Sequence, residues 1–265
     1  MNRLEGVVRH DAVVAAHGLH VHVRVQGEGL GDPLLLLNGF TRSLESWGPF
    51  VDALDERTVI SFDAPGVGES PVPYLPLSIV QLADVAASVL DHLAIARADV
   101  LGFSYGGAVA QQMAASHPTR VRRLVLVSTS CGLGTTLGAV HSTDKATLGK
   151  GASTWSHTVG ALWNSLALTS WSSISFLGTI KAPTLVVCGV DDSVAPPANS
   201  RVLARRIPDA SLVVLDGGHD LQASEPAPRL ATVVERFLGR VGVEQPVEGD
   251  SVRLADAGDL NDSEM

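Results

Sequence analysis

The 265-residue sequence lacks the features that mark a secreted or membrane protein. It contains two cysteines, Cys131 and Cys188. Nothing in the sequence supports a disulfide between them, and two buried reduced thiols are expected instead. No apolar run approaches the length of a transmembrane helix, and residues 1–6 lack the apolar core of a signal peptide. We therefore expect a cytoplasmic protein with no membrane span.

Basic residues are also scarce, and they form no basic stripe. The formal net charge is −9. Residues 241–265 hold seven acidic residues and one basic residue, which leaves 21 acids and 18 bases in residues 1–240. Residues 1–240 are therefore nearly neutral, which argues against nucleic acid as a partner. Residues 241–265 are poor in aromatic side chains, and we predict that they form an acidic, disordered C-terminal tail.

Residues 1–240 have the pattern of a single α/β domain. Segments typical of strands alternate with helical patterns, which predicts a mostly parallel eight-stranded sheet with helices on both faces. An antiparallel hairpin is expected at the start. The strands are expected near 7–15, 19–25, 34–38, 58–63, 98–103, 121–128, 184–189 and 211–216. The helices are expected near 44–54, 78–93, 105–117, 197–206 and 226–239. Residues 131–180 interrupt the alternation as an insertion.

The pentapeptide Gly102-Phe103-Ser104-Tyr105-Gly106 is the most informative motif of the chain. It lies between an apolar predicted strand and a predicted helix rich in small residues. A G-x-S-x-G sequence between a strand and a helix is typical of a nucleophile elbow, in which a sharp turn exposes the serine hydroxyl. The glycines allow close backbone approach, because a Cβ would clash there. Ser104 is therefore the candidate nucleophile.

A serine nucleophile needs a histidine base and an acid that orients the base. In α/β-hydrolase sheets these follow the serine in the order acid, then histidine, each after a strand. Asp191 and Asp192 follow the strand at 184–189, and His219 follows the strand at 211–216. The two aspartates compete for the role of the acid, since one of them is also suited to cap the next helix. The spacing to Pro196 favours Asp192, which resembles the acid loop of α/β-hydrolases.

Other histidines and aspartates have simpler explanations. His20 and His22 share a face of a strand, but no Cys, Asp or Glu lies at ligand spacing beside them, so we predict an exposed hairpin and no metal site. Asp63 is expected to hold the loop that follows it. Asp220 is adjacent in sequence to His219, which makes the geometry required of the acid awkward.

An oxyanion hole completes the predicted site. One N–H donor is expected from Tyr105, the residue after the nucleophile, and a second from the loop after the strand at 34–38. In that loop the turn Asn38-Gly39 precedes Phe40, so Phe40 is the second candidate donor. Many related chains carry His-Gly at this turn. Asparagine tolerates tight turns, so the change is compatible with catalysis.

These motifs together resemble the serine α/β-hydrolase superfamily. The likeness rests on LLLLNGF at 34–40, FDAPGVGES at 62–70 and AVAQQ at 108–112, and it extends over roughly residues 19–239. The Asn-Gly turn, the Pro-Gly-Val-Gly loop and the Ala-Gln-Gln helix start resemble intracellular poly(3-hydroxyalkanoate) depolymerases in particular. The resemblance implies an α/β-hydrolase fold in residues 1–240, with the insertion at 131–180 as a lid shorter than the cap of those depolymerases.

The predicted lid holds three of the four tryptophans, Trp155, Trp163 and Trp171. One hypothesis is that they pin a short helical lid to the body. A second, compatible hypothesis is that Trp155 and Trp163 line an apolar acyl-binding wall, because ligand pockets are mostly apolar and aromatic. A short lid leaves the site open to a polymer end or to varied small esters.

The leading functional hypothesis is a serine ester hydrolase that needs no metal or organic cofactor. Polyhydroxyalkanoate, its oligomers or other apolar esters are the expected substrates, and a small-ester or lactone hydrolase is the alternative within this class. A carbon–carbon bond hydrolase or a cofactor-free perhydrolase of the haloperoxidase type would use the same triad. A non-catalytic ligand sensor is the least favoured hypothesis, because the catalytic set is intact. The sequence leaves the oligomeric state open.

Overall fold

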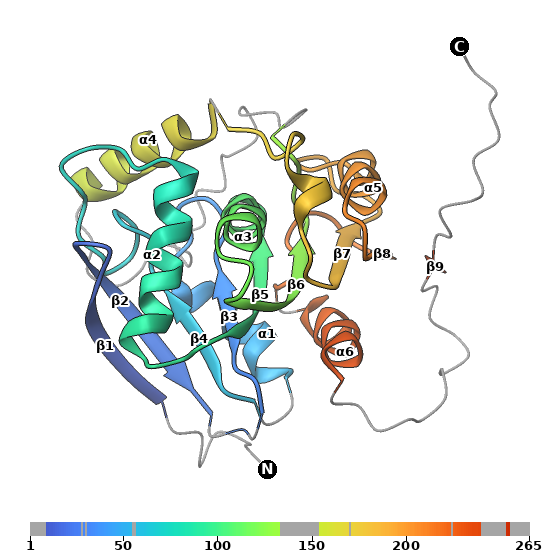
Figure 1. Ribbon diagram of the computed structural model, residues 1–265, viewed down its shortest axis with the longest axis horizontal. Coiled ribbons are helices and arrows are strands. Elements are labelled where there is room, and N and C mark those ends of the chain that lie inside the picture. The colour runs from blue at the N-terminus through green and yellow to red at the C-terminus, as the bar shows by residue number, and fades with distance from the viewer. Residues whose placement is uncertain are drawn as a thin grey trace.

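The computed structural model describes residues 9–27, 29, 31–54, 57–132, 154–169, 171–223, 225–239 and 253–254, without the side chains of residues 154–157 and 253–254. These residues form one sheet with the strand order β1-β2-β4-β3-β5-β6-β7-β8-β9 (Figure 1). Strands β3 to β8 pair with one another in parallel. Strands β1, β2 and β9 pair antiparallel at the two edges of the sheet. The strands are β1 (Arg9–Ala16), β2 (Leu19–Gln26), β3 (Leu34–Leu37), β4 (Val59–Phe62), β5 (Ala98–Phe103), β6 (Val121–Val127), β7 (Thr184–Gly189), β8 (Ala210–Leu215) and β9 (Arg253–Leu254).

Helices cover both faces of this sheet. Helices α2, α3 and α5 pack on one face, where Figure 1 shows α2 beside α3, and α1 and α6 pack on the other. The helices are η1 (Leu44–Trp47), α1 (Gly48–Asp52), α2 (Ile79–His92), α3 (Tyr105–Ser116), α4 (Thr154–Thr169), η4 (Leu177–Thr179), α5 (Pro197–Arg206) and α6 (Ala227–Leu238). The predicted doubly covered, mostly parallel sheet is confirmed, with each predicted element within about two residues of its observed bounds.

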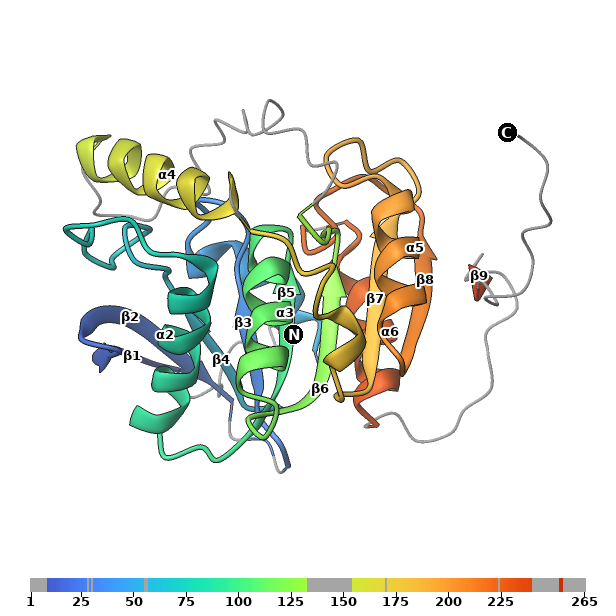
Figure 2. The ribbon, with the colours of Figure 1, turned by 45° about the horizontal axis from the view of Figure 1, so that its top comes forward.

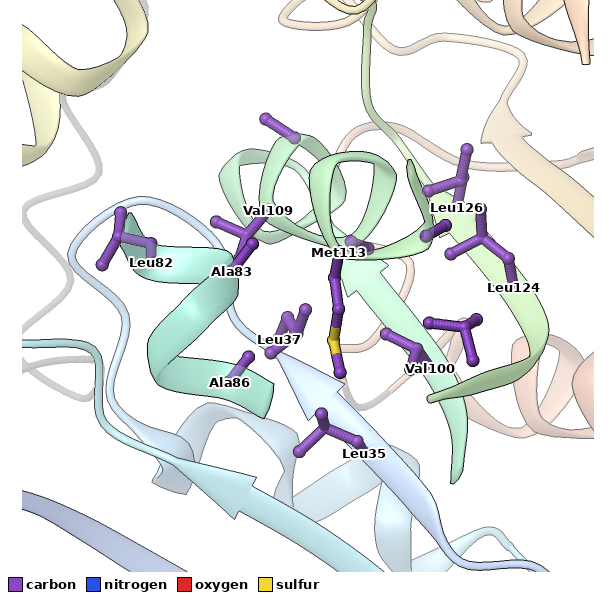
Figure 3. Close-up of a cluster of buried hydrophobic side chains, with 14 of the residues drawn as sticks. Leu35, Leu37, Leu82, Ala83, Ala86, Val100, Val109, Met113, Leu124 and Leu126 are labelled. Carbon is purple, nitrogen blue, oxygen red and sulfur yellow. The ribbon is translucent and has the colours of Figure 1, made fainter. Parts of the chain in front are cut away.

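The central strands are continuous apolar runs because both of their faces are covered. All four residues of β3 and all six of β5 are buried. Figure 3 shows Met113 of α3 among Leu35 and Leu37 of β3 and Val100 of β5. The resulting rigid sheet fixes the positions of the loops at the carboxyl ends of its strands, where catalytic groups of α/β folds are carried.

Three features of the structure extend or correct the predicted arrangement. The two-residue strand β9, from the predicted acidic tail, pairs antiparallel with β8 and adds a ninth strand at that edge, where β8 offers open backbone groups. The rest of the predicted tail lies outside the described residues. Helix α4 forms within the predicted insertion and lies across the end of the sheet toward which the parallel strands point (Figure 2). His22 is buried, which corrects the expectation of an exposed hairpin at that position.

Within the described residues, no helix is both long enough and apolar enough to cross a membrane.

Candidate active site

Ser104 lies alone between the last residue of β5 and the first residue of α3. Its φ of +51° and ψ of −114° are uncommon for a residue other than glycine. Strand β6 and the segment directly after it hold this conformation, because the Ser104 N–H donates to Val127 O at 2.9 Å and the Thr129 hydroxyl donates to Ser104 O at 2.7 Å. The backbone thus has the sharp strand-to-helix turn that the G-x-S-x-G sequence predicts.

The elbow leaves no room for side chains on its glycines. A Cβ on Gly106 would lie 2.0 Å from Leu37 O, and one on Gly102 would lie 2.4 Å from Gly106 O. A Cβ on Gly107 would lie 2.4 Å from the Thr129 hydroxyl oxygen. The absence of these atoms allows α3 to approach the end of β3 and brings the two loops of the predicted oxyanion hole together.

The structure brings Ser104, His219 and Asp192 into one hydrogen-bonded chain. His219 Nε2 lies 3.0 Å from Ser104 Oγ, and His219 Nδ1 lies 3.0 Å from each carboxylate oxygen of Asp192. The three residues follow β5, β8 and β7 respectively, and 115 residues separate Ser104 from His219 in sequence. This geometry allows the imidazole to accept the serine proton while the carboxylate fixes its orientation.

Asp192 is buried and Asp191 is exposed, which distinguishes the two candidate acids. Burial acts to raise the pKa of Asp192, but hydrogen bonds from His219 and from the N–H groups of Ala195 and Val194 outweigh it. The net effect is a pKa below the usual value, so the carboxylate is ionised at neutral pH. Of the two aspartates, Asp192 is the one the structure places against the imidazole.

The two residues that carry the candidate oxyanion donors, Phe40 and Tyr105, pack against each other. Tyr105 is the first residue of α3, so helix geometry gives its N–H no intrahelical acceptor. Phe40 lies in the turn after β3, and its ring packs edge-on against the Tyr105 ring with centroids 6.0 Å apart. The Asn38 side chain closes this turn by accepting from the Gly39 N–H at 2.8 Å and by donating to the Ser46 hydroxyl at 2.9 Å. Asparagine therefore supplies local bonds that stabilise the loop.

Asp63 and His22 lie at the base of the loops that border the site. The fully buried Asp63 carboxylate accepts from the N–H groups of Leu44 at 2.7 Å and Glu69 at 2.9 Å, so it holds its loop as expected. His22 Nδ1 lies 3.1 Å from the same carboxylate. His22 and Asp63 are 41 positions apart, so no local sequence pattern indicates their pairing.

A second unpredicted contact joins the oxyanion loop to the histidine loop. Arg42 Nη2 donates to the Asp220 carboxylate at 2.7 Å, and the Arg42 guanidinium lies 5.6 Å from the centroid of the Phe103 ring. That ring packs against the His219 imidazole, with centroids 5.1 Å apart. Asp220 therefore bonds Arg42 and does not compete with Asp192 for the imidazole.

Helix α4 closes over this region through three contacts with the body. A Cβ on Gly160 would lie 2.0 Å from Gly66 O, so the helix packs directly on the loop that contains Gly66. Trp163 Nε1 donates to Pro73 O at 3.1 Å, and the Tyr105 hydroxyl donates to Asn164 Oδ1 at 3.2 Å. Trp163 thus pins the predicted lid to the body, and its role in an acyl pocket stays a prediction. The Trp155 side chain lies outside the described residues.

Among the described residues, no group of three or more His, Cys, Asp or Glu side chains is arranged to hold a metal ion. The two cysteines are free and buried. The ionisable groups gathered beside Ser104 are those of the proton-transfer chain and the Arg42–Asp220 pair, and this set is suited to acid–base and nucleophilic chemistry.

Comparisons with known protein families agree with this geometry. A family model described as the alpha/beta hydrolase fold matches residues 32–155, which include Ser104 and the turn at Phe40. A second model, described as serine hydrolase (FSH1), matches residues 96–227, which include Ser104, Asp192 and His219.

Individual relatives cover most of the chain. A poly(3-hydroxyalkanoate) depolymerase of Ectopseudomonas oleovorans is 35% identical over 246 residues, which are 78% of this chain and 84% of that protein. A 2-hydroxymuconate semialdehyde hydrolase of Pseudomonas putida is 31% identical over 266 residues, with 85% of this chain and 92% of that protein covered. The crystal structure of the enol-lactonase from Burkholderia xenovorans LB400 superposes with a TM-score of 0.73 at 26% identity, covering 86% of this chain and 99% of that one.

Proposed function

The chain belongs to the α/β-hydrolase family, and on that premise we propose that it is a serine carboxylic-ester hydrolase that works through an acyl-enzyme. The observation that carries the proposal is the continuous hydrogen-bonded chain from Ser104 through His219 to Asp192. A serine hydroxyl is a weak nucleophile until a base removes its proton, and this chain supplies an oriented base.

In the proposed mechanism, Ser104 Oγ attacks the ester carbonyl carbon while His219 Nε2 accepts the hydroxyl proton. The ionised Asp192 stabilises the imidazolium that forms. The N–H groups of Phe40 and Tyr105 donate to the oxyanion of the tetrahedral intermediate. His219 then gives its proton to the departing alkoxide, which leaves an acyl group on Ser104. A water molecule, deprotonated by His219, attacks the acyl carbon and regenerates Ser104.

Polyhydroxyalkanoate, its oligomers or related hydroxyacyl esters are the substrates that we favour. Support comes from the 35% identical relative, which is named as a depolymerase of this polymer and shares most of its length with this chain. A small-ester or lactone hydrolase is the alternative within the same chemistry, supported by the likeness to the enol-lactonase. Carbon–carbon bond hydrolysis is a second candidate activity, favoured by the 31% identical relative. A perhydrolase would use the same triad.

The proposal is tested by hydrolysis of p-nitrophenyl esters of rising acyl length, with a polyhydroxyalkanoate suspension alongside. We expect turnover of the esters by the wild-type protein and a loss of roughly 10⁴–10⁶-fold in kcat for Ser104→Ala, since removing a triad member has this effect in other serine hydrolases. Folding should be unchanged. Retention of more than about one per cent of the activity by the purified variant would contradict the role of Ser104 that triad chemistry requires.

A further inference from the structure

The inner face of α4 carries a buried polar side chain, Asn164, that contacts the residue following the nucleophile. Gly160, Trp163 and Asn164 have the spacing of neighbours on one helix face, and each of them contacts the body. The helix contains no Asp, Glu, Lys or Arg. Asn164 is 4% exposed, so its amide is a buried polar group in this helix.

The Asn164 amide is only half satisfied. Its Oδ1 accepts from the Tyr105 hydroxyl at 3.2 Å, whereas its Nδ2 is buried and has no hydrogen-bond partner among the described residues. Exchanging the oxygen and nitrogen of the amide does not change this, because the Tyr105 hydroxyl then accepts from Nδ2 and leaves Oδ1 unpaired. A buried polar atom without a partner is costly and calls for an explanation, such as a ligand.

The position of Tyr105 indicates which ligand this is. Tyr105 follows the nucleophile directly, and its N–H is a proposed oxyanion donor. Tyr105 therefore faces the proposed site of the reacting carbonyl through its backbone N–H and contacts Asn164 through its hydroxyl. Burial raises the pKa of the Tyr105 hydroxyl, which keeps it neutral and able to bond the amide at any ordinary pH. An oxygen on the acyl chain, near its carbonyl, is therefore the polar substrate group that we match to the Asn164 amide.

We propose that Asn164 is a specificity-determining residue that donates a hydrogen bond from Nδ2 to an oxygen of the acyl group, such as a 3-hydroxyl. This inference rests on the proposed ester hydrolysis and refines it to hydroxyacyl esters. Tyr105 holds the other end of the amide, so the donor is presented in a fixed orientation. The shielded Nδ2 becomes accessible only as the substrate displaces the side chains that cover it, and a bound acyl group without the oxygen leaves the donor unpaired.

The test compares the p-nitrophenyl esters of 3-hydroxybutyrate, as separate enantiomers, and of butyrate. Each kcat/KM is divided by the rate constant of alkaline hydrolysis of the same ester, which removes differences in intrinsic reactivity. We expect the wild-type enzyme to favour one hydroxy ester by about tenfold or more, the effect of one buried hydrogen bond. In Asn164→Leu, which replaces the amide with an apolar group of similar size, the ratio of the corrected kcat/KM for the preferred hydroxy ester to that for the butyrate ester should fall to near one.

The matched control is Ser165→Ala, at the next position of α4. The Ser165 hydroxyl bonds Ala161 O within the helix, so its removal should leave both rates and their ratio unchanged. If Asn164→Leu does not fold, Asn164→Ala serves in its place, and the wild-type ratio is informative without either variant. An equal loss on both esters in the variant, or a wild-type ratio near one, would overturn the role of Asn164. A wild-type protein that hydrolyses none of these esters contradicts the proposed function itself.

Discussion

Asp191 and Asp192 show how much one position in a loop changes the chemistry available to a side chain. Asp191 is exposed, while Asp192 is 3% exposed and receives bonds from an imidazole and two backbone N–H groups. An ionised carboxylate in that position favours the imidazole tautomer that carries its proton on Nδ1 and leaves Nε2 free to accept from Ser104. The acid role that we propose therefore depends on the burial of one residue of the pair.

Substituting each aspartate in turn tests this assignment. Asp192→Asn should lower kcat for ester hydrolysis by about 10⁴-fold, as the corresponding change does in serine proteases, because the imidazole is then held in the wrong tautomer. Asp191→Asn is the matched control, with the same chemical change one residue away, and it should retain nearly full activity. Steady-state kinetics on one p-nitrophenyl ester measures both. A larger loss for Asp191→Asn would show that the acid has been misassigned.

At the scale of elements, we propose that α4 and the loop beneath it select the acyl groups that the site accepts. The Trp163 indole donates to Pro73 O, which positions the helix. The indole is only half-buried, so part of its aromatic surface is left uncovered by the protein. Trp171, from the same insertion, donates its indole N–H to Gln112 Oε1 at 3.0 Å and packs edge-on against Phe176, so its side-chain contacts differ from those of Trp163. The two tryptophans therefore offer a comparison between a lid position and a body position.

Replacing Trp163 with Ala should weaken the hydrolysis of long acyl esters more than that of short ones. Each acyl methylene that loses its burial costs up to ~0.8 kcal/mol, so two or three lower kcat/KM for an octanoate ester by roughly tenfold or more. Hydrolysis of the acetate ester should hardly change. Trp155→Ala is expected to behave in the same way.

Trp171→Ala is the control for this experiment. It should lower the melting temperature and reduce activity on both esters by the same factor, because its contacts are with the body. If Trp163→Ala also reduces acetate and octanoate hydrolysis equally, Trp163 pins the lid and does not line the acyl pocket.

At the scale of the whole molecule, a buried ionic network ties together segments that are distant in sequence. Arg57 is bonded by both oxygens of Glu235, at 3.2 and 3.1 Å, and its Nη1 lies 3.3 Å from Asp99. Arg122 donates to both oxygens of the Asp99 carboxylate and shares Oδ2 with Arg57. Burial raises the pKa of Asp99, against the opposing effect of Arg122 and Arg57. The network joins the ends of β4, β5 and β6 to α6.

Removing the central cation should destabilise the fold strongly. Arg57→Met leaves the buried Glu235 carboxylate without its partner, and breaking a buried pair in this way costs about 3–5 kcal/mol of the free energy of unfolding. Arg9→Met, which breaks the exposed pairs of Arg9 with Asp11 and Glu45, should cost about 1 kcal/mol or less. Urea unfolding measures both. The double variant Arg57→Met/Glu235→Gln should recover part of the loss, and equal stabilities of the two single variants would contradict the account.

The sequence predicts the sheet, its covering helices and the loops of the candidate site because each leaves a local signal. The strands are apolar runs, and Ser104, Asp192 and His219 each follow one of them in the order expected of the fold. Contacts such as Arg57 with Glu235 or Tyr105 with Asn164 leave no such signal, since they join residues 178 and 59 positions apart. The burial of His22 was missed for the same reason, because its partner Asp63 lies on another strand end.

The measurement that tests the central claim most directly is covalent labelling by a fluorophosphonate, followed by peptide mass spectrometry. This reagent reacts with a serine only when a base activates the hydroxyl. The account predicts rapid stoichiometric labelling of the wild-type protein, with the adduct on Ser104, and no labelling of Ser104→Ala or of heat-denatured protein. No adduct on the folded wild-type protein, or an adduct on another serine that persists in Ser104→Ala, would contradict it.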